Sequence, residues 1–137
     1  MHPLNSYNFL RKEDSMLDAF VVGIGGFCGA VLRYLIGLLP INSGHGFPVK
    51  TFAINLAGCF LIGIVAALAA KNSSVSPKMI LFLKVGLCGG FTTFSSFALE
   101  TTGLLEKGQI WIALLYAVGS VVAGVGAVYL AELMMGR

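Results

Sequence analysis

The stretch Gly86-Leu87-Cys88-Gly89-Gly90-Phe91-Thr92-Thr93-Phe94-Ser95-Ser96-Phe97 lies in the middle of a long apolar segment. It combines three glycines, two threonines, two serines and three phenylalanines. A helix in hydrocarbon is not broken without cause, because every freed backbone group costs several kcal/mol. Glycine and hydroxyl residues at this depth therefore predict a broken helix whose backbone and side-chain dipoles face something polar.

The rest of the chain predicts a membrane protein. Of its 137 residues 57% are hydrophobic and only 11% are charged. A soluble four-helix bundle would need a charged face on each helix, and the sequence provides none. Four apolar stretches approach the length of about 20 residues that crosses a bilayer. We therefore expect an all-α membrane protein with one four-helix domain over residues 17–137 and transmembrane helices at about 17–39, 51–70, 79–105 and 109–134.

Residues 1–16 are polar and only mildly basic, unlike the start of a cleaved signal peptide. We interpret them as a loose N-terminal extension. Translation could begin at Met1 or at Met16, and the sequence leaves both open.

Basic residues predict the orientation only weakly. Four crossings place both chain ends on one side, with six basic residues on that side against three on the other. That count favours the ends inside, but without the N-terminal extension it becomes four against three, which is compatible with insertion in both orientations. The end side holds Arg11, Lys12, Lys71, Lys78, Lys84 and Arg137, and the other side holds Arg33, Lys50 and Lys107.

Small residues at a spacing of four predict close helix packing. Gly25 and Gly29 form such a step in the first helix, and Ser120 and Gly124 form another in the fourth. Four helices are few for enclosing a pore, so packing surfaces on several helices indicate an oligomer.

Three phenylalanines of the central stretch, Phe91, Phe94 and Phe97, are spaced three apart and are expected to form one helical stripe. Aromatic packing is the ordinary interpretation. The functional one is that positive ring edges face an anion, assisted by hydrogen bonds from hydroxyls and from Asn55. Asn55 could equally be interhelical glue, and freed carbonyls near Gly89 to Thr92 could instead hold a cation. No fixed positive charge near the stripe is predicted to trap an anion.

Three motifs together resemble the fluoride channel family known as CrcB or Fluc, over essentially the whole chain from Met16. The first helix contains Gly25-Gly26-x-x-Gly29-x-x-x-Arg33-Tyr34, and the second contains Asn55-x-x-Gly58. The third and most specific motif is Gly89-Gly90-Phe91-Thr92-Thr93-Phe94-Ser95-Ser96-Phe97. Length and hydropathy agree with the family as well.

The resemblance implies a fluoride-selective passive ion channel that exports cytoplasmic fluoride and so reduces fluoride toxicity. It implies a multi-pass protein of the cell's inner (plasma) membrane. It also implies an antiparallel, dual-topology homodimer with two pathways along the subunit interface. Phe94 and Phe97 would present ring edges to the ion, Asn55 would face them, and Ser120 and Tyr116 would line the same path.

Further residues take roles from the same resemblance. Hydroxyls of Thr93 and Ser96 would extend the pathway, Glu100 would lie toward its end, and Arg33 would lie near a vestibule. A structural Na⁺ would be held at the helix break by the backbone carbonyls of Gly89 and Thr92.

Other functions remain open from the residues alone. A small dual-topology, proton-coupled multidrug exporter would need a membrane-embedded carboxylate, and Asp18 or Glu100 could serve. A membrane scaffold would explain the small residues but not the Gly-Gly-Phe-Thr-Thr-Phe-Ser-Ser-Phe run in mid-membrane. The sequence shows no nucleophile–base pair and no metal-ligand set, so we do not expect an enzyme.

Overall fold

The computed structural model describes residues 3–41, 44, 46–71 and 74–136, with side chains from Asp14 onward. Four helical segments are long and apolar enough to cross a membrane: Asp14–Gly37, Val49–Lys71, Pro77–Glu106 and Ile110–Met134. The predicted all-helical, four-span architecture is confirmed. The elements are α1 (Pro3–Gly37), α2 (Val49–Lys71), α3 (Pro77–Ile80), η1 (Leu81–Cys88, π-helical), α4 (Gly89–Phe91), α5 (Phe94–Glu106) and α6 (Ile110–Met134).

The N-terminal segment is helical where we expected a loose extension. Helix α1 begins at Pro3 and continues without interruption into the first span. The physical reason is local, because no proline or glycine occurs between Leu4 and Val22 to end a helix. Polarity at the start of the chain was therefore a poor guide to its backbone conformation. Met1, one of the two candidate starts, lies outside the described residues.

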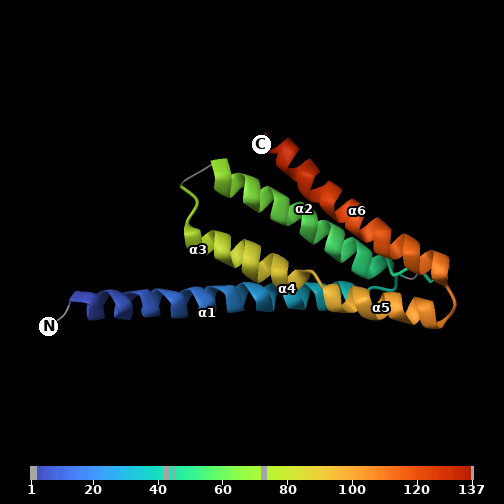
Figure 1. The fold of residues 1–137 in the computed structure, drawn as a ribbon, viewed down its shortest axis with the longest axis horizontal. Helices are drawn as coiled ribbons and strands as arrows, with labels where there is room; N and C mark the ends of the chain where they lie inside the picture. The colour runs from blue at the N-terminus through green and yellow to red at the C-terminus, as the bar shows by residue number, and fades with distance from the viewer. Residues whose placement is uncertain (1–2, 42–43, 45, 72–73, 137) are drawn as a thin grey trace.

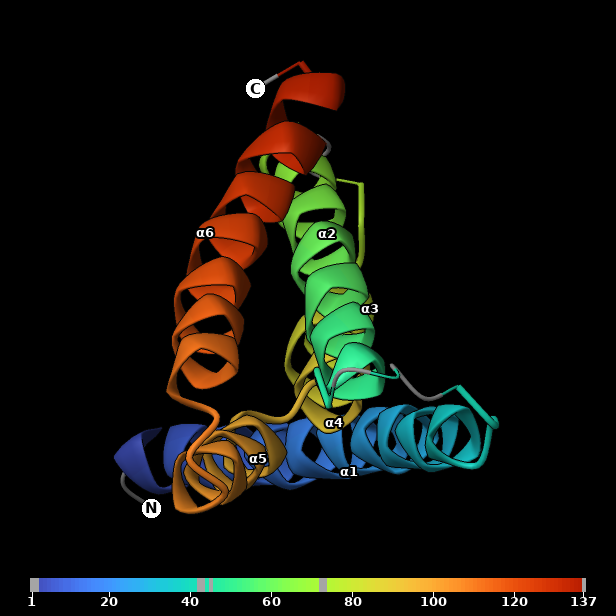
Figure 2. The same ribbon diagram turned by 90° about the vertical axis from the view of Figure 1, so that its right-hand side faces the viewer.

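The helices pack in the order α1, the third span, α2 and α6. The most extensive contacts join α2 to α6 and α1 to η1, whereas α1 and α2 touch little. Figure 1 shows both chain ends toward the same end of the bundle, with the α5–α6 turn at the other. In the end-on view of Figure 2, α2 and α6 lie on the same side of α1.

The third span is broken at Thr92 and Thr93. Both residues are extended, with ψ of 158° at Thr92 and φ of −149° at Thr93. Gly89 and Gly90 remain helical, so the break follows the glycine pair rather than occurring at it. The predicted mid-membrane break is confirmed, but its position lies in the threonines.

The predicted stripe of three phenylalanines is wrong for Phe91. Two extended residues separate α4 from α5 and reset the helical phase, so Phe91 does not continue the face of Phe94 and Phe97. Phe91 is buried, whereas Phe94 and Phe97 pair with ring centroids 5.5 Å apart.

Glycines set the close approach of α1 and the third span. A Cβ on Gly25 would lie 2.5 Å from the Phe82 carbonyl oxygen, and one on Gly29 would overlap the Leu87 carbonyl. From the other side, a Cβ on Gly86 would lie 2.9 Å from the Cα of Gly25. Backbone therefore packs directly on backbone here, as the spacing of four predicted.

The outer surface is apolar, as expected for lipid contact. Phe27 is 70% exposed on α1 and Trp111 is 83% exposed on α6. A soluble domain rarely leaves so much apolar surface uncovered. The protein interior is correspondingly small, and Tyr116 is its largest fully buried side chain among the described residues.

Candidate functional site

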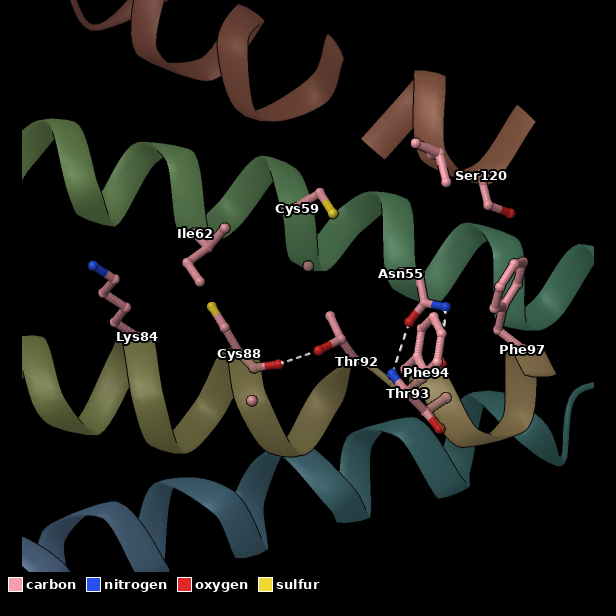
Figure 3. Close-up of a pocket in the computed structure, with 13 residues that line it drawn as sticks. Asn55, Cys59, Ile62, Lys84, Cys88, Thr92, Thr93, Phe94, Phe97 and Ser120 are labelled. Carbon is pink, nitrogen blue, oxygen red and sulfur yellow. Dashed lines mark hydrogen bonds between the residues drawn. The ribbon is translucent and has the colours of Figure 1, made fainter. Parts of the chain in front are cut away.

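An open groove of about 330 Å³ runs between α2, the third span and α6. Figure 3 shows its side chains, with Lys84 and Ile62 toward one end and Asn55, Phe97 and Ser120 toward the other. No Asp or Glu occurs among the described residues that line it. The lining consists of Asn55, Gly58, Cys59, Ile62, Lys84, Cys88, Gly89, Thr92, Thr93, Phe94, Phe97, Ser120 and Val121.

Asn55 holds the break in the third span. The Thr93 N–H donates to Asn55 Oδ1 at 2.7 Å, and Asn55 Nδ2 donates to the Thr93 carbonyl oxygen at 3.1 Å. One side chain therefore satisfies both polar groups of an extended residue that would otherwise lose its helical partners. Asn55 therefore joins α2 to the third span and also lines the groove. One of its two Nδ2 hydrogens is not used in these bonds and can be donated to another acceptor.

The Thr93 side chain caps the helix that follows. Its Oγ1 accepts from the Ser96 N–H at 3.2 Å and donates to Ser96 Oγ at 3.0 Å, as a helix N-cap does. In a continuous helix the Thr93 N–H would bond the Gly89 carbonyl, and the Ser96 N–H would bond the Thr92 carbonyl. Asn55 and the Thr93 hydroxyl take these donors instead, and so free the Gly89 and Thr92 carbonyl oxygens.

Arg33 satisfies a third carbonyl released by the break. Its Nε donates to the Gly90 carbonyl oxygen at 3.2 Å across the α1–α4 contact. Arg33 does not line the groove. With Lys50, Ser96 and Glu100 it lines a second pocket of about 440 Å³, whereas Thr93 lines both.

An aromatic row leads from the groove into the bundle. The rings of Phe97 and Tyr116 lie 5.0 Å apart between centroids, next to the Phe94–Phe97 pair. Exposure falls steeply along the row, from 79% at Phe94 to a fully buried Tyr116. Phe94 thus presents its ring to the open side of the groove.

Ser120 provides an unused hydroxyl. Its Oγ is buried and has no hydrogen-bond partner among the residues that the structure describes. A serine in a helix often bonds back to a carbonyl of its own helix, but Ser120 does not. Because Ser120 lines the groove, its O–H is available to a bound acceptor.

Glu100 lies beyond the aromatic row, where two hydroxyls hold its carboxylate. Thr51 Oγ1 donates to Oε1 and Tyr116 Oη donates to Oε2, each at 2.7 Å. These bonds join α2, α5 and α6 at one point. Tyr116 does not line the groove, but its ring packs against Phe97, which does.

Comparison with known proteins gives the family. The family model described as CrcB-like protein, Camphor Resistance (CrcB), matches residues 20–132, which include all of the groove. The chain belongs to the CrcB family. Among curated CrcB relatives, the fluoride-specific ion channel FluC of Chlorobium phaeobacteroides (strain BS1) is 50% identical over 109 residues, covering 80% of this chain and 85% of the relative.

Two further relatives carry the same name. The FluC of Chlorobaculum tepidum is 45% identical over 119 residues, covering 87% of this chain and 94% of its own. The FluC of Agrobacterium fabrum is 42% identical over 123 residues, covering 89% and 98%. Together with the four apolar spans, membership in the CrcB family makes the chain a multi-pass protein of the cell membrane.

Sequence reasoning missed two residues at or near the groove of this CrcB protein. Thr51 was not singled out because a threonine at the start of a span is unremarkable, yet it is the partner of Glu100. Lys84 was counted only for orientation, but its side chain lines the groove. Its place inside an apolar span was the signal available in the sequence, and it adds a positive charge at the end of the groove away from the phenylalanines.

Proposed function

We propose that this chain is a fluoride-selective passive channel that exports cytoplasmic fluoride and so reduces fluoride toxicity. The observation that carries the proposal is the groove, which collects hydrogen-bond donors and phenylalanine rings without a carboxylate among its described lining residues. Its CrcB relatives are named fluoride-specific ion channels. Such proteins are not enzymes, and nothing in the proposal requires a chemical step.

The groove fits a small anion that accepts strong hydrogen bonds. The Ser120 hydroxyl and the remaining Nδ2 hydrogen of Asn55 replace part of the ion's hydration shell, and ring edges of Phe94 and Phe97 add a weak positive potential. Chloride is larger and forms weaker hydrogen bonds, so it recovers less of its dehydration cost. Neutral donors also bind weakly enough for the ion to leave, which conduction requires.

The far end of the pathway runs past the aromatic row. We assign Tyr116, Thr93 and Ser96 to its polar wall, and Glu100 to its end. Both carboxylate oxygens of Glu100 already accept hydrogen bonds from hydroxyls, and these bonds partly compensate its negative charge and weaken its repulsion of an anion. Arg33 contributes to the nearby vestibule and also fixes the end of α4.

We further propose an antiparallel, dual-topology homodimer. The groove is open along one side, and Phe94 is 79% exposed there. A second copy covering this side would seclude the ion from lipid, which four helices cannot do alone. Weak charge bias between the two sides of the membrane permits the inverted orientation that such a pair needs.

A structural Na⁺ fits the break in the third span. Sodium is a hard cation that prefers oxygen ligands, and the Gly89 and Thr92 carbonyl oxygens lose their helical donors to Asn55 and Thr93. The ion would stabilise the extended residues from the dimer side without permeating. Replacing sodium by a large organic cation should lower the unfolding temperature of the dimer, whereas an unchanged temperature would contradict the site.

The proton-coupled multidrug exporter is the competing function. It needs a carboxylate that exchanges protons with solvent, and Asp18 and Glu100 are its candidates. We expect cells that lack fluoride export to regain growth in acidic fluoride medium when they express this chain or its Asp18→Asn variant. Failure of the unmodified chain would contradict the channel, whereas drug export that Asp18→Asn or Glu100→Gln abolishes would favour the exporter.

A further inference from the structure

Lys84 is the charged residue of the groove. It lies on η1 and lines the groove at the end opposite Ser120, and no other Lys, Arg, Asp or Glu occurs among the described lining residues. In Figure 3 its side chain extends from the third span toward α2, near Ile62. Its ammonium therefore lies beside the space through which an ion would enter.

The depth of Lys84 requires an explanation. It lies seven residues after Pro77, where the span begins, which is about 10 Å at 1.5 Å per residue. An ionisable group inside a span is costly and usually marks an ion or substrate path. A lysine can also extend along a helix to bring its ammonium to the interface, which needs no function.

Helix geometry favours the first explanation. Lys84, Cys88 and Thr92 recur at a spacing of four, and all three line the groove. The π-helical turns of η1 include the first two, and such turns are frequent at functional sites. Lys84 thus lies on the same helical face as Thr92, which directly precedes the break at Thr93.

We propose that Lys84 forms an anion-binding site at the mouth of the groove, on the side of the membrane that holds the chain ends. The inference rests on the proposed fluoride channel function. Its ligand is a small, still hydrated monovalent anion, held by charge rather than by fitted hydrogen bonds. Eight residues, or about 12 Å of helix, separate Lys84 from Thr92, so the charge raises the local ion concentration without trapping the ion at the narrow part.

The site should affect rate but not selectivity. An ammonium attracts fluoride and chloride alike, so discrimination stays with Asn55, the phenylalanines and Ser120. The effect should also be screened, because the Debye length falls from about 30 Å at 0.01 M salt to about 3 Å at 1 M.

Fluoride efflux from liposomes tests the proposal with four proteins: unmodified, Lys84→Gln, Lys84→Arg and Lys78→Gln. Lys78 is the matched control, since it lies six residues earlier in the same span but does not line the groove. We expect Lys84→Gln to slow efflux about fivefold at low ionic strength, with a smaller difference at high salt. Lys84→Arg and Lys78→Gln should match the unmodified protein, and chloride should stay excluded in all four.

The outcomes distinguish failure of the proposed channel function from failure of the proposed Lys84 site. An unmodified protein that releases no fluoride contradicts the proposed function itself. If it conducts but Lys84→Gln matches it at every ionic strength, the Lys84 site is wrong. A Lys84→Gln defect that neither salt reduces nor arginine rescues indicates a structural role and also overturns the site.

Discussion

At the scale of single residues, Asn55 uses both polar atoms of its side chain on one backbone unit, Thr93. By contrast, the Ser120 hydroxyl has no hydrogen-bond partner among the described residues, and the Phe94 ring is largely exposed; both line the groove. This division explains how the site can be rigid yet bind weakly. The protein fixes the shape of the break with Asn55, and along the proposed pathway the ion would meet groups that have no other strong partner.

Asn55→Asp tests the first half of that division. A carboxylate still accepts from the Thr93 N–H but cannot donate to the Thr93 carbonyl, and it places negative charge in an anion path. We expect strongly reduced fluoride efflux and a loss of about 1–3 kcal/mol of stability. Efflux from liposomes and thermal unfolding in detergent measure the two effects. Normal flux would show that Asn55 acts only as interhelical glue.

Phe97→Ile tests the ring edges. Isoleucine keeps the apolar volume but lacks the aromatic quadrupole, so fluoride efflux should fall about tenfold, the equivalent of about 1.4 kcal/mol in the barrier. Phe94→Ile should behave likewise, while dimer formation persists in size-exclusion chromatography. Phe27→Ile, on the exposed outer face of α1, is the control. Equal flux in all four proteins would remove the assigned role of the rings.

At the scale of elements, the third span depends on two unlike contacts. On one side Gly86 packs backbone to backbone against Gly25 of α1. On the other side the break turns Thr93 toward α2. The first contact holds η1 and α4 on α1, and the break that follows them faces the groove.

Gly29→Ala should disturb that contact. Its Cβ would overlap the Leu87 carbonyl, and backbone cannot move aside as a flexible side chain can. We expect a loss of about 1–3 kcal/mol, the usual cost of overpacking, measured as a lower unfolding temperature. Gly23→Ala is the matched control on the same helix, because no atom lies within 4 Å of its Cβ. Equal stability of the two variants would contradict the packing described here.

The positions of the four spans could be predicted from hydropathy. The exact position of the break and the contacts between distant residues could not. The break was predicted from the glycines and hydroxyl residues of residues 86–97, but Gly89 and Gly90 stay helical and Gly90 serves packing. What decides the break is a partner far along the chain, Asn55, and local sequence does not reveal it. For the same reason the Thr51–Glu100–Tyr116 cluster and the placement of Lys84 in the groove required the structure.

At the scale of the whole molecule, a half-open groove and an almost balanced charge distribution point to the same assembly. Four spans place both chain ends at one end of the bundle, as Figure 1 shows. In the proposed homodimer a second copy covers the exposed groove, and an inverted copy is available only if insertion is not strongly biased.

Reporters of inside and outside location, fused in turn to the C-terminus, should both be active in cells. Lys107 lies outside the spans on the side opposite the chain ends, so Lys107→Gln should shift the balance toward ends inside. An inverted copy becomes scarcer, and fluoride resistance should fall with it. A single orientation in the unmodified protein would contradict the dual-topology homodimer.

The measurement that tests the central claim most directly is ion efflux from liposomes containing the purified protein, with sodium on both sides and no proton gradient. A fluoride electrode and a parallel chloride assay record release from the same preparation. The account predicts fast fluoride release with chloride retained. Retention of fluoride by vesicles containing folded dimers, or equal release of both ions, would contradict a selective passive fluoride channel.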